Sequence, residues 1–159
     1  MKVGMIGLGD IARKAYLPVV GCRPDIDLSI CTRNPARLEE IGNAFRIPPE
    51  QRFRTVQDMA EAGVEAVFVH TATEAHVEMV TYLLERGIHV YVDKPIDSTF
   101  ARSEQIVQLA NRQGLVLMVG FNRRFAPPLS GHPRPRETRL GHPAKESGEP
   151  SGLGQKRHL

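Results

Sequence analysis

The sequence has few cysteines and no long apolar run. Its 159 residues include two cysteines, Cys22 and Cys31, which form neither a Cys-x-x-Cys motif nor closely spaced pairs. This pattern excludes a disulfide framework and favours a reducing compartment. Asp10, Arg13 and Lys14 interrupt the apolar residues near the N-terminus, and no run approaches the roughly 20 apolar residues that cross a bilayer. We therefore expect a cytoplasmic protein with no membrane partner.

The first 128 residues also lack a net charge. Six of the 21 Lys and Arg residues and three of the 18 Asp and Glu residues lie after Pro128, so fifteen of each remain before it. A neutral domain has no broad basic surface for nucleic acid. Only the positive charge of the tail supports a nucleic-acid-binding hypothesis, and we expect no nucleic-acid partner.

The segment 129–159 contains no Val, Ile, Met or aromatic residue. Only five of its residues are apolar, and Gly, Pro, His and Arg are abundant. Because such a segment cannot form a packed core, we predict a disordered or aberrant tail over residues 128–159. Its histidines, His132, His142 and His158, lack metal-ligand spacing, and we predict no metal site.

A frameshift is another explanation of this tail. Removing one cytosine from the adjacent codons of Pro127 and Pro128 allows a reading frame that continues the preceding helical pattern. We therefore expect the chain to be truncated or frameshifted near residue 127. The DNA sequence beyond the Pro127 codon would test this expectation.

Residues 1–127, by contrast, alternate short apolar runs with amphipathic helical patterns. The runs predict strands at residues 2–7, 28–31, 64–70, 89–92 and 115–119, and we expect a further short strand near residues 52–54, which makes six. The patterns between them predict helices at residues 11–20, 35–45, 74–86 and 100–112, and a short helix after Thr55. This alternation is typical of parallel βαβ units. We predict one α/β domain over residues 1–127, a doubly wound parallel Rossmann sheet of six strands in the order 3-2-1-4-5-6.

Some residues have predicted roles at the ends and faces of these helices. Asn34, Thr55 and Thr73 are candidate N-caps, because their side-chain oxygens can accept hydrogen bonds from the first turn of a helix. The helical spacing also predicts which residues face the sheet: Ile11, Ala15 and Val19 in the first helix, and Val77, Val80, Leu83 and Leu84 in the helix at 74–86.

The first predicted strand is followed directly by the sequence GLGDIA, which fits the pattern Gly-x-Gly-x-x-Ala. Gly7 permits a tight turn, Gly9 lets the backbone approach a pyrophosphate, and Ala12 lets the helix pack closely on the strand. The free N–H groups of the helix N-terminus favour phosphate binding. We expect this loop, including Asp10 and Ile11, to bind a dinucleotide. The alternative is an ordinary strand-turn-helix connection.

The end of the second predicted strand indicates which cofactor is bound. A NAD site usually carries an acid there, which binds the ribose 2′-hydroxyl. This sequence has Thr32 and Arg33 instead, and a guanidinium can hold a 2′-phosphate. We therefore predict that NADP is preferred over NAD, with Arg33 as the principal contact and Arg37 as a second. Alternatively, Arg33 stacks on the adenine or points to solvent.

Two further loops follow the fourth and fifth predicted strands, at the edge where the nicotinamide is expected. In the first loop, we expect Thr71, Thr73 and His76 to contact the cofactor. In the second, the ammonium group of Lys94 could polarise a carbonyl or hydroxyl, and Asp93 could share in proton transfer. We take Lys94 and Asp93 as candidate catalytic residues. A solvated surface lysine is the alternative.

Three motifs together resemble a known family. The GLGDIA loop, the turn Asp93-Lys94-Pro95 and the sequence GFNRRF at residues 120–125 resemble the N-terminal domain of the Gfo/Idh/MocA oxidoreductase family. Residues 67–127 are similar to its branch of virulence factor MviM-like proteins. The resemblance implies an NAD(P)-dependent oxidoreductase that transfers a hydride to or from a sugar- or polyol-like small molecule. The alternative is a non-catalytic module that binds a nicotinamide dinucleotide.

The resemblance also implies roles for particular residues. It places Lys94 beside the nicotinamide and the reacting carbon, and Asn122 and Arg123 in the substrate cleft. Family members continue into a substrate-binding domain that commonly forms the oligomer interface, and nothing after Pro128 resembles it. We therefore expect this chain to be inactive alone. We also expect self-association, as a homo-oligomer, through apolar residues that the missing domain would cover: Met118, Phe121 and Phe125.

Overall fold

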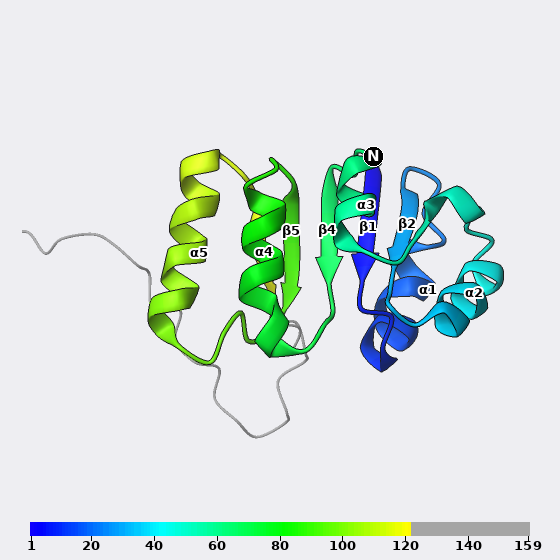
Figure 1. The fold of residues 1–159 in the computed structure, drawn as a ribbon, viewed down its shortest axis with the longest axis horizontal. Coiled ribbons are helices and arrows are strands. Elements are labelled where there is room, and N and C mark those ends of the chain that lie inside the picture. Colours follow the sequence, from blue (N-terminus) through cyan, green and yellow to red (C-terminus); the bar gives the residue numbers. More distant parts are fainter. Residues whose placement is uncertain (122–159) are drawn as a thin grey trace, which may run out of the picture. The chain divides into compact units, whose positions relative to one another are not determined.

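The computed structural model describes residues 1–121 and contains one sheet of six parallel strands. The strands are β1 (Lys2–Ile6), β2 (Asp27–Cys31), β3 (Arg52–Phe53), β4 (Ala66–Val69), β5 (His89–Asp93) and β6 (Leu117–Gly120). Their order is β3-β2-β1-β4-β5-β6, so the predicted fold class and topology are confirmed (Figure 1). The predictions for Asn122, Arg123, Phe125 and the tail at 128–159 lie outside the described residues.

Helices cover both faces of the sheet. They are α1 (Leu17–Val20), α2 (Pro35–Ala44), α3 (Val56–Glu61), α4 (His76–Leu84) and α5 (Phe100–Gln113), with the short turns η1 (Ala12–Tyr16), η2 (Pro49–Gln51) and η3 (Thr73–Ala75). On one face, α3, α4 and α5 form an apolar cluster with β4 and β5. On the other, η1, α1 and α2 pack against β1 and β2. Because neighbouring residues of a strand point to opposite faces, β1 contributes Met5 to one cluster and Ile6 to the other.

The first helix differs from its prediction. The structure exposes the three residues that were expected to face the sheet: Ile11, Ala15 and Val19. The helix begins with the π-helical turn η1, in which the N–H of Leu17 donates to the carbonyl of Ala12, five residues earlier. Ala12, Leu17 and Val20 are buried instead. The predicted face was wrong from its first residue, because Ala12 and not Ile11 faces the sheet. The extra residue of the π-helical turn then places Leu17, five residues after Ala12, on the buried face.

Two of the three predicted N-caps are confirmed. Asn34 Oδ1 accepts a hydrogen bond from the Arg37 N–H at 3.1 Å, and Thr55 Oγ1 accepts one from the Asp58 N–H at 3.1 Å. The third prediction was wrong. Thr73 lies inside the 3-10 turn η3, and α4 begins only at His76, after Ala75, without a side-chain cap. The turn therefore ends the loop after β4 before the α-helix starts.

The predicted inward face of α4 is largely confirmed. Val80, Leu83 and Leu84 are fully buried, and Val77 is partly buried against the same cluster. Within residues 1–121, no helix is long and apolar enough to cross a membrane. The same residues contain no group of three or more His, Cys, Asp or Glu side chains that could hold a metal ion.

Candidate functional site

The glycine-rich loop after β1 meets the loop after β4. Gly7 has a φ of +84°, and a Cβ added to it would lie 2.6 Å from the carbonyl oxygen of His70. Both conditions require glycine at this position. Ala12, at the start of η1, has no exposed surface, so the helix packs tightly on the sheet behind the loop.

Gly9 is different, because a Cβ added to it would meet nothing within 4 Å among the described residues, apart from its neighbours in the chain. The space beside its backbone is open, as the approach of a phosphate requires. Asp10 and Ile11 follow on the exposed side of the loop. Asp10 forms an ion pair with Lys14 at 2.8 Å, and this hydrogen bond lowers the pKa of the Asp10 carboxyl. The side chain of Asp10 therefore points along the surface of the helix.

A pocket of about 600 Å³ lies at the carboxyl ends of β1 and β2. Four of the predicted cofactor-binding residues line it together: Gly7, Thr32, Arg33 and Thr71. This is the edge where the order of the strands reverses between β1 and β4, which is the expected ligand site of a doubly wound sheet. The pocket therefore connects the glycine-rich loop with the end of β2.

The pocket contains a polar group that a ligand could pair with, the hydroxyl of Thr71. Thr71 Oγ1 is buried, and it has no hydrogen-bond partner among the described residues. An unpaired buried hydroxyl costs about 1–3 kcal/mol, which a ligand oxygen would offset. The open space beside Gly9 leaves room for a phosphate, and the hydroxyl of Thr71 can bond to a ribose oxygen. The residues present therefore fit a dinucleotide.

The two predicted arginines occupy different positions. Arg33 is exposed and lines the pocket, so it can reach a 2′-phosphate there. Arg37 Nη1 donates to the carbonyl of Leu8 at 3.2 Å, which holds its guanidinium against the glycine-rich loop. Arg54 lines the pocket from the end of β3 and was missed by the sequence analysis. Its position at the carboxyl end of a predicted strand was the signal that could have identified it.

Burial raises the pKa of the Cys31 thiol to about 12. Cys31 ends β2 and lines the same pocket, with 3% of its surface exposed. A thiol with so high a pKa stays protonated at neutral pH and is a poor nucleophile. Cys31 therefore contributes an apolar wall to the pocket.

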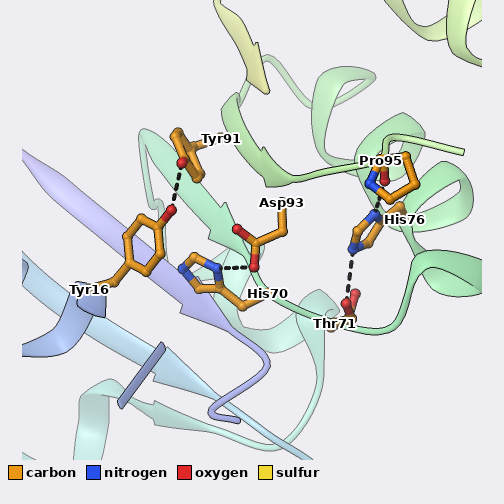
Figure 2. Close-up of polar contacts among 7 residues, drawn as sticks. All are labelled: Tyr16, His70, Thr71, His76, Tyr91, Asp93 and Pro95. Carbon is orange, nitrogen blue, oxygen red and sulfur yellow. Dashed lines mark hydrogen bonds and ion pairs between the residues drawn. The ribbon is translucent and has the colours of Figure 1, made fainter. Parts of the chain in front are cut away.

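His76, a predicted cofactor contact, is buried between two loops. Only 1% of its surface is exposed. Its Nδ1 lies 2.9 Å from the carbonyl oxygen of Pro95, and its Nε2 lies 2.9 Å from that of Thr71 (Figure 2). Both of these backbone oxygens only accept hydrogen bonds, so His76 is the donor, and its side chain joins the loop after β4 to the turn after β5. Thr73, one turn earlier in η3, is partly buried.

The turn after β5 places Asp93 and Lys94 at the same edge. Asp93 Oδ2 lies 2.8 Å from Nδ1 of His70, whose side chain is 1% exposed, whereas that of Asp93 is 24% exposed (Figure 2). Lys94 follows immediately and is exposed. The sequence analysis gave His70 no role. The parallel register of β4 and β5 is the signal that could have identified it. Val69 pairs with Val92, so the residues that follow them, His70 and Asp93, are neighbours.

Tyr16 covers this pair and was also missed by the sequence analysis. It projects from η1, and its ring centroid lies 4.2 Å from that of His70. Its hydroxyl hydrogen-bonds that of Tyr91 at 2.6 Å (Figure 2). Burial, followed by this hydrogen bond, raises the pKa of Tyr16. The phenol of Tyr16 therefore stays neutral, and its hydrogen bond to Tyr91 keeps the Tyr16 ring over His70.

Known proteins match this chain in both sequence and structure. A family model described as "Oxidoreductase family, NAD-binding Rossmann fold" matches residues 1–121. The protein YceM of Salmonella typhimurium is 40% identical over 143 residues, which are 89% of this chain and 44% of YceM. The crystal structure of the dehydrogenase MviM from Clostridium difficile has a TM-score of 0.74 and 42% identity, covering 80% of this chain and 41% of that one.

A more distant structure contains a bound nucleotide. The 3-ketoreductase KijD10 from Actinomadura kijaniata, in complex with TDP-benzene and NADP, has a TM-score of 0.72 and 27% identity. The match covers 80% of this chain and 40% of KijD10. This chain therefore spans less than half the length of each of these three relatives. With the family model matching the whole described sheet and its glycine-rich loop, the chain belongs to the Gfo/Idh/MocA oxidoreductase family, whose NAD-binding Rossmann fold it contains.

Proposed function

We propose that this chain is the cofactor-binding part of an oxidoreductase that prefers NADP and transfers a hydride to or from a sugar- or polyol-like substrate. The observation that carries the proposal is the pocket where Gly7, Arg33 and Thr71 meet. It lies at the expected ligand edge of the sheet and contains a buried hydroxyl, that of Thr71, with no hydrogen-bond partner within residues 1–121. Membership of a family described as NAD-binding supports a nicotinamide dinucleotide as the ligand.

The preference for NADP is supported by the charge of the pocket. Among the described residues that line it, none is acidic, and two are arginines, Arg33 and Arg54. A carboxylate would repel a 2′-phosphate, whereas guanidinium groups bind phosphate through charge-assisted hydrogen bonds. The NADP complex of KijD10, a structural relative, is consistent with this preference.

The remaining site residues have distinct proposed roles. The loop from Gly7 to Ala12 holds the pyrophosphate, and Thr71 donates to or accepts from a ribose hydroxyl. When bound, the nicotinamide supplies or accepts the hydride. Lys94 holds or releases the proton on the substrate oxygen, and Asp93 lies next to it as the second catalytic candidate.

The substrate class is proposed from the printed description of one structural relative. KijD10 is named a 3-ketoreductase and was crystallised with a TDP ligand, which supports a sugar-like substrate for this chain. Asn122 and Arg123 are proposed to line the substrate cleft. The presence of Asp93 and Lys94 at the cofactor edge favours a catalytic protein over a non-catalytic binding module, which would not need them.

Titration of the 159-residue chain with NADPH, NADP⁺, NADH and NAD⁺ tests the cofactor. We expect tighter binding of the phosphorylated pair. Arg33→Ala and Arg54→Ala should each weaken NADPH binding about tenfold or more, because a charge-assisted hydrogen bond is lost, while leaving NADH binding unchanged. Arg112→Ala, on the exposed last turn of α5, is the matched control. Tighter binding of NADH would contradict the preference, and no binding of any of the four would contradict the proposed function.

A further inference from the structure

The side chains of His70 and Asp93 form a polar pair at the carboxyl edge of the sheet. The register of β4 and β5 places the two residues side by side, and the Nδ1 to Oδ2 distance is 2.8 Å. A carboxylate only accepts hydrogen bonds, so Nδ1 of His70 carries a proton and donates it. The orientation of the Asp93 carboxylate is therefore set by a residue of the neighbouring strand (Figure 2).

The side chain of His70 is enclosed by its surroundings. It is 1% exposed, and its Nε2 is buried with no hydrogen-bond partner among the described residues. The rings of Tyr16 and Tyr91 pack around it. Because the imidazole is held in place, its Nδ1 fixes the position of the Asp93 carboxylate and of the negative charge on it.

This negative charge lies at the edge where the cofactor is proposed to bind. Asp93 is 24% exposed, and Oδ2 is the oxygen that His70 engages. The next residue, Lys94, is exposed and cationic. The nicotinamide ring is a cation when oxidised and neutral when reduced. An ammonium group alone at this edge would therefore disfavour the oxidised form.

We propose that Asp93, oriented by His70, makes the site favour the oxidised nicotinamide cofactor over the reduced one. The fixed carboxylate offsets the positive charge of Lys94 and attracts the cationic ring. His70 acts as a positioning residue, because its buried imidazole holds the carboxylate and Tyr16 holds the imidazole. This inference rests on the proposed cofactor site.

The ratio of two dissociation constants tests the proposal without requiring turnover. Kd values for NADP⁺ and NADPH are measured on the 159-residue chain and on Asp93→Asn in mildly alkaline buffer. Loss of a unit charge near the ring should raise the ratio Kd(NADP⁺)/Kd(NADPH) about tenfold. A tenfold change is equivalent to about 30 mV in the potential of a bound two-electron couple. Glu85→Gln, which removes the same charge from the exposed end of α4, should leave the ratio unchanged.

Variants of His70 test whether its imidazole orients the Asp93 carboxylate or only fills space in the core. His70→Asn keeps a donor near the position of Nδ1 and should retain the wild-type ratio. His70→Leu should raise the ratio, but less than Asp93→Asn does, because the carboxylate keeps its charge and loses only its fixed orientation. Asp93→Glu keeps the charge and should also retain the ratio. Should Asp93→Asn not fold, as judged by circular dichroism, the contrast between His70→Leu and His70→Asn decides the question.

Two results would overturn the inference. One is an unchanged ratio in a folded Asp93→Asn chain. The other is an equal loss of affinity for both oxidation states, because that result indicates a structural role only. If the wild-type chain binds neither NADP⁺ nor NADPH, and neither NAD⁺ nor NADH, it is the proposed function that fails, and with it the basis of the inference.

Discussion

The two glycines of the loop after β1 have different structural surroundings. An alanine at position 7 would combine an unfavourable φ of +84° with a contact of 2.6 Å to the His70 carbonyl. An alanine at position 9 would extend into open space. Gly7→Ala should therefore lower the free energy of unfolding by about 2–3 kcal/mol or more, whereas Gly9→Ala should leave it nearly unchanged.

Cofactor binding by the same two variants completes this prediction. Both should bind NADPH at least about tenfold more weakly, Gly7→Ala because the loop moves and Gly9→Ala because its methyl group occupies the space of the pyrophosphate. Urea unfolding and fluorescence titration measure the two quantities. Unaltered NADPH affinity in Gly9→Ala, or wild-type stability in Gly7→Ala, would contradict the assignment of the loop.

Individual site residues could be predicted from the sequence where their position depends only on the end of a strand. Thr32, Arg33 and Thr71 each follow a predicted strand, and all three line the pocket. The burial of His76 could not be predicted, because it depends on which loops fold over the side chain. His70 was missed for a related reason, since its partner Asp93 lies on a different strand and is found only from the register.

Among the elements, strands and helices differ in how well the sequence predicts them. Strands β1, β2, β4 and β5 are apolar runs with buried residues in the middle of the sheet, so their composition identifies them. The edge strand β3 has only the two residues Arg52 and Phe53, both partly buried, and its composition is a much weaker signal. The turn η1 could not be predicted, because an extra residue in one helical turn leaves the composition unchanged. It moves Leu17 into the core and directs Tyr16 over His70. The irregular turn thus shapes the candidate site, as π-helical turns often do.

The start of α3 provides a test of an element next to the pocket. Thr55 Oγ1 accepts from the Asp58 N–H, and the hydroxyl donates back to the Asp58 carboxylate at 2.6 Å. Thr55→Ala should lower the free energy of unfolding by about 1 kcal/mol, because an N-cap is lost. Thr55→Ser keeps the hydroxyl and should be close to wild type in urea unfolding. Equal stabilities of the alanine and serine variants would show that the cap contributes nothing.

In the domain as a whole, the two faces of the sheet are covered unequally. Leu117 and Val119 of β6 pack into the cluster formed with α4 and α5. Val116 and Met118 point to the opposite face and are 62% and 45% exposed, and Phe121 beyond them is 53% exposed. The cluster on that face is built from β1 and β2 with η1, α1 and α2, among the residues that the structure describes. An apolar strip therefore remains open along β6.

This strip predicts concentration-dependent self-association of the chain. Exposed neighbouring apolar side chains on one strand favour contact with a second copy. Met118→Lys should shift the equilibrium towards monomer, since a charge on the strip must be desolvated on association. Val107→Lys is the matched control, because Val107 is 42% exposed but lies on α5. Sedimentation velocity over a range of concentrations measures the effect. A wild-type chain that stays monomeric at high concentration, or an equal shift in the control, would show that the strip is not an association surface.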